Sequence, residues 1–348
     1  ERLEKLHPGL ISELDSKLVR YAALLHDIGH PPYSHMLEDR TIFMTFHGHE
    51  LWGWKIIDEP NNDLRKALIQ NIGESGISRL KDIYAGRVHP IALHEIVSSQ
   101  LDVDRLDYLL RDQYHSGADV GTYDVQRIFR SLRLDENGSL RLHPNGVPAV
   151  ESYLLTRLHM YKLVYFHKLN ILTSEYHRKA LRRARELASS GRLEISDAIR
   201  GMLLSSDLDV SGYLSIDDSV VSSAISSWRE SKDKELRFWV DRILSRDSFH
   251  KRISIPGLTP EHVERCMIAI SAEISSAGYD PVRDLILARV DNVGYRPYQS
   301  GIRLVDGKDI ADISSVAAAI TETVHDTMVF VPSSVRNACE EVVKRTLN

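Results

Sequence analysis

The stretch from Ala22 to Glu38, AALLHDIGHPPYSHMLE, constrains this chain more than any other. An apolar helical pattern leads to an adjacent His26-Asp27 pair. Gly29 and the two prolines that follow indicate that the helix ends there, because proline has no backbone N–H to donate. At a helix end, an imidazole nitrogen and a carboxylate oxygen can converge on one divalent cation. The pair therefore predicts a metal site, the alternative being an ordinary hydrogen bond at a helix end.

The apolar pattern before this pair favours a buried helix face. Leu18, Ala22 and Leu25 recur at i, i+4 and i+7, which is the period of one face of a helix. Residues 1–28 are predicted to be helical with a break at the His-Pro-Gly tripeptide 7–9. We expect Asp15 or Ser16 to cap the helix that runs to the metal pair.

More histidines lie close to the pair and are candidates for moving a proton or for contacting phosphate. His30 and His35 follow three and eight residues after Asp27. His49 and Glu50 stand at the start of an amphipathic helix within residues 41–58, on which Leu51, Trp54 and Ile57 are expected to form the apolar face. Because an imidazole titrates near neutral pH, histidine is the usual acid/base residue. The alternative for the His-Glu pair is a helix cap with a solvated histidine.

A second strong stretch, LDVDRLDYLLRDQYHSG, covers residues 101–117. Its apolar residues Val103, Leu106 and Leu110 are spaced as a core face. Another face of the same helix carries Asp104, Tyr108, Asp112 and His115. A solvated face usually prefers Lys and Glu, so this line favours a functional role. The alternative is that the acids pair with Arg105 and Arg111.

A third pattern lies in residues 148–188, which are predicted to be helical. Arg157, Tyr161, Tyr165 and Lys168 fall at i, i+4, i+8 and i+11. A basic and aromatic stripe suits a phosphorylated ring compound, because arginine donates two parallel hydrogen bonds to phosphate. An ordinary helix with core aromatics and a basic rim is the equal alternative. Before this region, a Glu136-Asn137-Gly138 turn between alternating segments predicts a β-hairpin.

Composition excludes several classes of protein. The 348 residues carry a net charge of −5 and give a sequence pI near 6.4, so nucleic-acid binding is not indicated. Two cysteines are too few for a disulfide framework and favour a reducing, cytoplasmic compartment. No apolar run approaches the roughly 20 residues of a membrane span, so we expect a protein that is not inserted in a membrane.

The predicted fold is mainly α, with a helical core and a smaller C-terminal α+β lobe. We expect a core over residues 1–190, a helical extension over 191–250 and the α+β lobe over 251–348.

Four motifs in order, HDIGHPPYSHMLE, the His49-Glu50 pair, DVDRLDYLLRD and RLHMYKLVYFHK, resemble the HD-domain deoxynucleoside triphosphate triphosphohydrolases. This family includes bacterial dGTPase-like enzymes and the vertebrate SAM-and-HD-domain dNTPase. The resemblance covers residues 10 to 190 firmly. It implies a helical HD core that hydrolyses (deoxy)nucleoside triphosphates to nucleoside and tripolyphosphate, by water attack at the α-phosphorus.

The resemblance also implies roles for individual residues. The metal ligands would be His26, Asp27 and Asp104. The catalytic acid/base group would be His49 with His35 and Glu38. The substrate would be bound by His30, Arg105, Tyr108, Asp112, Arg157, Tyr165 and Lys168. Among these, Tyr108 and Asp112 would hold the sugar and Tyr165 would pack near its C2′ atom.

The implied cofactor is a divalent metal, one of Mn, Mg, Fe, Zn, Ni or Co. The implied partners are a nucleoside triphosphate substrate, a nucleotide activator and further copies of the chain in a dimer or tetramer. Another HD phosphohydrolase, acting as a nucleotidase or phosphodiesterase, and a catalytically silent nucleotide sensor are the alternative functions.

The chain departs from the family pattern at one position. The family has a further metal-binding histidine before the His-Asp pair, in an H-x-R-F-x-H-S type of motif. His7 is the only histidine upstream of His26, and its neighbours do not match that motif. We therefore expect the chain to begin downstream of the missing ligand.

Overall fold

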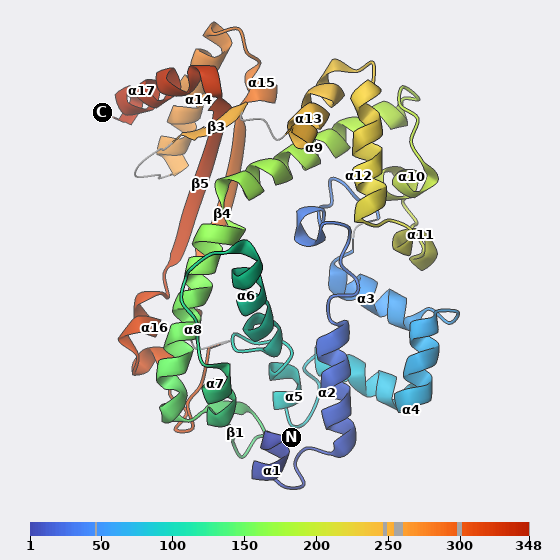
Figure 1. Ribbon diagram of the computed structural model, residues 1–348, viewed down its shortest axis with the longest axis vertical. Coiled ribbons are helices and arrows are strands. Elements are labelled where there is room, and N and C mark those ends of the chain that lie inside the picture. The colour runs from blue at the N-terminus through green and yellow to red at the C-terminus, as the bar shows by residue number, and fades with distance from the viewer. Residues whose placement is uncertain (46, 246–248, 254–259, 298–300, 348) are drawn as a thin grey trace. The chain divides into compact units, whose positions relative to one another are not determined.

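The computed structural model describes residues 1–45, 47–245, 249–253, 260–297 and 301–347. Most of these residues are helical, and the described strands form two small sheets (Figure 1). The prediction of a mainly α fold with a smaller α+β lobe is therefore confirmed.

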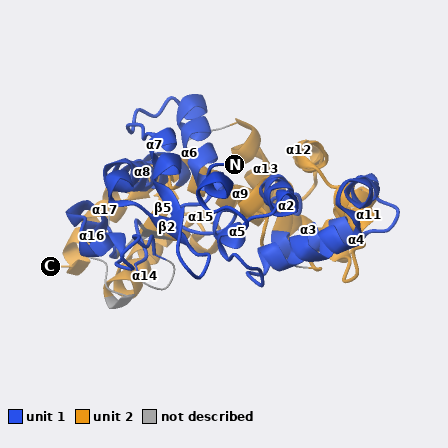
Figure 2. Cartoon of the chain, turned by 90° about the horizontal axis from the view of Figure 1, so that it is seen from below, with its two compact units in different colours: residues 1–30, 47–165, 292–324 blue, residues 31–46, 166–291, 325–348 orange. Residues whose placement is uncertain are grey.

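The chain divides into two compact units, each built from three separate segments (Figure 2). The first unit comprises residues 1–30, 47–165 and 292–324, and the second comprises residues 31–46, 166–291 and 325–348. The division predicted from the sequence follows continuous segments and stays a prediction.

The described residues of the first unit are mainly helical and include one hairpin. Its elements are α1 (Arg2–Leu6), α2 (Glu13–Leu25), α3 (His49–Asp58), α4 (Asp63–Tyr84), α5 (Ala92–Glu95), α6 (Val103–Ser116), α7 (Val125–Ser131), β1 (Leu132–Leu134), β2 (Leu140–Leu142), η2 (Pro144–Gly146), α8 (Val147–Met160), the π-helical turn η3 (Tyr161–Tyr165), η5 (Ile310–Asp312) and α16 (Ser315–Ala319). The predicted hairpin is confirmed, since β1 and β2 pair antiparallel with Leu132 opposite Leu142.

Helix α2 begins earlier than the sequence predicts. Ser12 is the N-cap residue, and its hydroxyl accepts the backbone N–H of Asp15 while the Asp15 carboxylate accepts the N–H of Ser12. This reciprocal capping box satisfies two donors that a helix start leaves open. The prediction of a cap at Asp15 or Ser16 was wrong, because Asp15 serves as the third helical residue of that box.

Helix α2 buries the face that its sequence predicts. Leu18, Ala22 and Leu25 are buried and pack with residues of α4, including Leu80 and Ile83, in one hydrophobic cluster. Burial of this kind contributes about 25 cal/mol per Å² of apolar surface, so packing on α4 holds the C-terminal end of α2 in place.

Two other apolar faces differ from the prediction. In α3 the buried residues are Trp52, Ile56 and Ile57, whereas Leu51 is exposed. In α6 the fully buried residues are Leu106 and Leu109, with Val103 and Leu110 only partly buried. Both buried faces are rotated by about one residue from the predicted faces. Tertiary contacts, and not the spacing of apolar residues alone, decide which side of a helix is covered.

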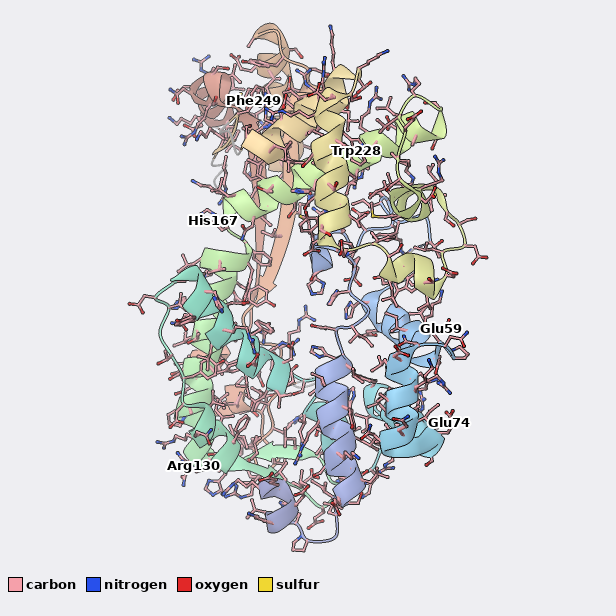
Figure 3. All side chains as sticks on the ribbon, turned by 45° about the vertical axis from the view of Figure 1, so that its right-hand side comes forward. Glu59, Glu74, Arg130, His167, Trp228 and Phe249 are labelled. Carbon is pink, nitrogen blue, oxygen red and sulfur yellow. The ribbon has the colours of Figure 1, made fainter. Side chains whose placement is uncertain are left out.

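A single helix over residues 148–188 does not form. After α8 the chain makes the π-helical turn η3, and α9 (Lys168–Ser189) starts afresh after His167. Figure 3 labels His167 at this break. The backbone of His167 is extended, and its ring accepts the N–H of Leu169, which caps the new helix. Lys168 therefore does not continue the line of Arg157, Tyr161 and Tyr165.

The second unit consists of helices and one three-stranded sheet. Its elements are η1 (Ser34–Met36), α9, α10 (Asp197–Leu204), α11 (Val210–Leu214), α12 (Asp218–Ser227), η4 (Trp228–Glu230), α13 (Lys234–Ser245), β3 (His250–Ile253), α14 (Pro260–Ser276), α15 (Pro281–Asp284), β4 (Ile286–Val293), β5 (Thr323–Pro332), η6 (Ser333–Val335) and α17 (Arg336–Leu347). The strand order is β3-β5-β4, and the chain passes between the units within β4 and β5.

Two packing layers stabilise the second unit. Helix α9 packs on α13, and α14 packs on α17. Beneath the second pair, Ile253 of β3 and Val329 and Val331 of β5 form a buried cluster with Cys266 and Cys339. Across the described residues, no helix is long and apolar enough to cross a membrane.

A buried histidine joins the sheet to α9 in the second unit. His250 is 2% exposed, its Nδ1 accepts the hydroxyl of Tyr176 at 2.9 Å, and its Nε2 lies 3.2 Å from the carbonyl oxygen of Asp284. The neutral ring satisfies both contacts, with Nε2–H as the donor. Burial lowers the pKa of His250 to about 4 from an ordinary value of 6.5.

This histidine predicts acid sensitivity. Between pH 6.5 and pH 4 the unfolded chain binds a proton at His250 and the folded chain does not, so the free energy of unfolding falls as the pH falls. The full effect is about 3 kcal/mol. Urea unfolding of the wild-type chain and of His250→Gln, compared from pH 7.5 to pH 4, should show the flatter profile in the variant. Parallel profiles would contradict this assignment.

Candidate active site

Three predicted metal ligands come together in the first unit. His26 lies at the end of α2, Asp27 follows it, and Asp104 lies in the first turn of α6. The Nε2 atom of His26 is 3.1 Å from Asp27 Oδ1 and 3.4 Å from Asp104 Oδ1. One ligand atom from each residue lies within 4.8 Å of the others. The contact between His26 and Asp104 therefore joins residues that are 78 positions apart in the sequence.

The orientation of the His26 ring is set by the backbone. Its Nδ1 lies 2.8 Å from the carbonyl oxygen of Ala23, so Nδ1 carries the proton and Nε2 faces the two carboxylates. Nε2 is buried and makes no hydrogen bond of good geometry to any described residue. A lone pair that faces two anionic oxygens needs a positive charge between them.

Either a proton or a metal ion can supply that charge. Without a metal, the Asp104 and Asp27 carboxylates raise the pKa of His26 to about 10. Two atoms that bind one cation at about 2.1 Å lie about 3.0 Å apart at a right angle and about 3.4 Å apart at a tetrahedral angle. The observed 3.1 and 3.4 Å match these separations, so the residues fit a divalent ion.

Two further histidines of the first unit pack beside the cluster. His30 Nε2 is 3.5 Å from Asp27 Oδ1, and the His30 ring stacks on the His49 ring with centroids 4.0 Å apart. The pKa of the Asp27 carboxyl is lowered, chiefly by His26 and next by His30. Asp27 is therefore ionised at neutral pH, as a metal ligand must be.

Gly29 permits this packing, and its role differs from the helix stop that the sequence predicts. A Cβ at Gly29 would lie 2.0 Å from the carbonyl oxygen of His49 and 2.3 Å from the backbone N of Gly53. Only glycine fits where α3 approaches the turn so closely. The sequence signal was present, since a glycine stands between Asp27 and His30, but a close approach cannot be read from one segment alone.

The polar face of α6 continues from Asp104 toward η3. The hydroxyl of Tyr165 donates to Asp112 Oδ2 at 2.7 Å, and the Tyr165 ring packs edge-on against Tyr108 and Tyr161 at 6.1 and 5.1 Å. Burial, followed by the Asp112 carboxylate, raises the pKa of Tyr165, so this hydroxyl keeps its proton. Helices α6 and α8 lie side by side (Figure 1), and the turn η3 that follows α8 carries Tyr161 and Tyr165.

Arg157 of α8 carries unused hydrogen-bond donors at this place. Its guanidinium carbon lies 5.8 Å from the centroid of the Tyr161 ring. Its Nε and Nη1 atoms are buried and have no hydrogen-bond partner in the described part of the chain. A buried cationic donor without a partner is costly, and an anionic ligand would satisfy it.

The other predicted cations are placed differently. The Nη1 of Arg105 pairs with the Asp102 carboxylate and the carbonyl oxygen of Ser99, so its role as a phosphate contact stays a prediction. Asp102 also caps α6 by accepting the N–H of Arg105. Sequence reasoning missed this cap, although an aspartate directly before an apolar helical pattern is its usual signal. Lys168 is exposed and begins α9 in the second unit.

The remaining predicted catalytic residues lie in the second unit. His35 of η1 places Nδ1 3.0 Å from Oε2 of Glu38. A histidine hydrogen-bonded to a carboxylate is the usual arrangement for an oriented acid/base pair. His115, on the predicted line of α6, is exposed near the end of that helix.

His7 is engaged elsewhere in the first unit. Its Nε2 accepts the backbone N–H of Leu134 at 3.1 Å, so it supports the hairpin.

Comparison with known families identifies the fold. A family model described as the HD domain matches residues 1–112, and one described as an HD associated region matches residues 123–274. The chain therefore contains a segment, residues 1–112, that matches the HD domain. The site of His26, Asp27 and Asp104 thus lies within the HD domain.

Among curated proteins, the chain is similar to the uncharacterized protein YwfO of Bacillus subtilis, with 28% identity over 292 residues that cover 82% of this chain and 64% of YwfO. It is also similar to the deoxynucleoside triphosphate triphosphohydrolase SAMHD1 of Gallus gallus, with 27% identity over 279 residues that cover 69% of this chain and 44% of that protein. The chain spans less than two thirds of either relative. The predicted resemblance to HD-domain dNTPases is confirmed.

The fold agrees with a solved structure. The crystal structure of a phosphohydrolase from Bacteroides thetaiotaomicron matches with a TM-score of 0.75 and 24% identity, over 95% of this chain and 83% of that one. This likeness shows that the two chains share a fold.

The ligand geometry predicts measurable metal binding. Asp104→Ala should weaken Mn²⁺ binding by about 100-fold, because it removes one of three charged or imidazole ligands. Isothermal titration calorimetry on the chelator-treated chain measures this change. The matched control is Asp107→Ala on the same helix, since Asp107 is exposed and pairs with Arg111. Equal affinity of the Asp104 variant and the wild type would rule out the ligand role.

The close approach at Gly29 predicts a large loss of stability. Gly29→Ala should lower the free energy of unfolding by about 3 kcal/mol, because backbone on both sides must move. Gly53→Ala is the control, since its Cβ would meet only the Ile28 side chain at 3.8 Å and Gly29 N at 3.9 Å. Thermal unfolding of both variants tests the difference. Similar melting temperatures in the two variants would contradict the packing described here.

Proposed function

We propose that the chain is a metal-dependent nucleoside triphosphate triphosphohydrolase that acts on deoxynucleotides and releases nucleoside and tripolyphosphate. The observation that carries this proposal is the buried guanidinium of Arg157, whose Nε and Nη1 lack partners among the described residues. It lies by Tyr161, next to the Tyr165–Asp112 hydrogen bond. The dNTP triphosphohydrolase relatives support the choice of substrate.

The dimensions of α6 agree with a nucleotide. Asp104 at the metal cluster and Asp112 at the tyrosines are eight residues apart on one helix, which is about 12 Å along its axis. A nucleoside phosphate can bridge such a span, whereas inorganic phosphate cannot. In this proposal the phosphates lie toward Asp104 and the sugar toward Asp112.

His26, Asp27 and Asp104 would hold the metal in this proposal. A bound divalent ion would polarise a phosphoryl oxygen and lower the pKa of a water molecule. Arg157 would neutralise charge on the triphosphate, because its donors are already buried and oriented. Asp112 would accept a sugar hydroxyl, with Tyr165 packed against the same ring.

The departing oxygen needs a proton. His49 is a candidate donor, because the stacked His30 ring restricts its orientation and imidazole is suited to proton transfer near neutral pH. His35 with Glu38 is the second candidate, and Arg105 and Lys168 are weaker contacts to phosphate. Assembly into dimers or tetramers and activation by a nucleotide, which the family resemblance in the sequence implies, belong to the same proposal.

Product analysis tests the reaction. The chain is incubated with each of the eight common NTPs and dNTPs in Mn²⁺ or Mg²⁺, and the products are separated by chromatography. We expect nucleoside and tripolyphosphate, with dNTPs preferred. Nucleoside monophosphate and pyrophosphate would contradict cleavage of the bond between the α-phosphorus and the 5′ oxygen of the sugar. Nucleotide binding without any product would favour the silent sensor.

A substitution tests the role of the buried Arg157 guanidinium. Arg157→Ala should lower kcat/KM by about 100-fold, since a buried donor to phosphate is worth about 3 kcal/mol in the transition state. Arg111→Ala is the control, because Arg111 is exposed and pairs with Asp107. Steady-state kinetics with the preferred dNTP measure both. An unchanged kcat/KM in the Arg157 variant would remove this residue from the site.

A further inference from the structure

A strained backbone segment lies in the second unit. Tyr33 and Ser34 have φ values of 56° and 50°, and they are the non-glycine residues with positive φ in the described backbone. The left-handed region costs about 1–2 kcal/mol for a residue with a Cβ. Two such residues in succession persist only where surrounding contacts hold them.

Helix α12 supplies those contacts. The Asp218 Oδ1 atom accepts the backbone N–H of Tyr33 at 2.8 Å. The Tyr33 hydroxyl hydrogen-bonds to Ser222 one turn further along α12, and the Tyr33 ring lies 5.5 Å from the ring of His177. Asp218 is thus the side chain that holds the strained backbone, and the tyrosine ring is fixed by the same helix.

The strained pair leads directly into a proposed acid/base group. Ser34 begins the short helix η1, which presents His35, and the Nδ1 of His35 contacts Glu38. The buried Pro32 and Leu37 anchor the segment on either side. Between these anchors, the direction of the His35 side chain depends on the φ angles of Tyr33 and Ser34.

We propose that Asp218 is a positioning residue for His35, acting through the backbone N–H of Tyr33. This inference rests on the proposed function, in which His35 and Glu38 take part in proton transfer. Asp218 is neither a proposed metal ligand nor a proposed substrate contact. Its contribution is to keep a strained backbone in one conformation, so that His35 does not have to reorganise during turnover.

The neighbouring residue provides a matched control. Asp217 is the N-cap of α12, and its Oδ1 accepts the N–H of Val220 at 2.8 Å and the hydroxyl of Ser219 at 2.6 Å. Asp217→Ala removes a cap from the same helix and leaves the Asp218 contact in place. If Asp218 acted only through the stability of α12, Asp217→Ala would lower kcat as much as Asp218→Ala or more.

The kinetic test uses the full chain with the preferred dNTP. Asp218→Ala should lower kcat about tenfold with KM within twofold of wild type. Asp218→Asn should keep most of the activity, because the amide oxygen can accept the same N–H. Asp217→Ala should lower the melting temperature and leave kcat unchanged. Equal kcat in wild type and Asp218→Ala, or equal losses in the Asp217 and Asp218 variants, would overturn the proposal.

A second measurement separates this proposal from the proposed function. Hydrogen exchange at the Tyr33 amide should become at least tenfold faster in Asp218→Ala and stay unchanged in Asp217→Ala. Unchanged exchange in Asp218→Ala would show that Asp218 does not clamp the Tyr33 backbone, and it would overturn the proposal whatever kcat the variant has. If the wild type hydrolyses no nucleotide but the exchange result holds, the proposed function fails and the clamp on the Tyr33 backbone stands.

Discussion

The first unit depends on one electrostatic constraint, which is that two carboxylates face the same nitrogen of His26. Asp27 and Asp104 lie within 3.4 Å of Nε2. Such an arrangement is stable only with a positive charge at its centre. The ends of two helices must meet to create it. The packing of α2 on α4, the cap of α6 by Asp102 and the glycine contact at Gly29 are the structural conditions for that meeting.

The two ends of α6 differ in chemical character. The metal cluster concentrates negative charge at the start of α6, whereas the far part of α6 presents Asp112 and aromatic rings. Arg157 brings a guanidinium with buried donors to the aromatic part. A ligand with anionic phosphates and a ring would satisfy the buried donors of Arg157 and pack against these aromatic rings, and a bound cation would offset the charge of the cluster. The π-helical turn η3 contributes by placing Tyr165 within hydrogen-bond distance of Asp112.

Local patterns allowed much of this to be predicted. The periodicity of Leu18, Ala22 and Leu25, the β-hairpin turn and the mainly α fold follow from short-range rules. The break at His167 was missed, because neither glycine nor proline marks it and the helical spacing continues through it. The contact between Asp218 and Tyr33 joins residues 185 positions apart, so no local pattern could reveal it. The assignments of substrate residues stay predictions.

The discontinuous make-up of the first unit has a consequence for how the chain is synthesised. Its core around α6 and α8 includes Tyr295, Ile302 and Leu304, which are buried in the same cluster as Leu109 and Tyr153. Gln100 accepts the backbone N–H of Arg296, which adds a polar link to that late segment. A ribosome must therefore complete the whole second-unit segment 166–291 before the helices of the first unit can close their own core. Until then, apolar surface on α6 and α8 stays exposed and can be bound by chaperones. The metal cluster at the start of α6 meanwhile lies in an incompletely folded unit.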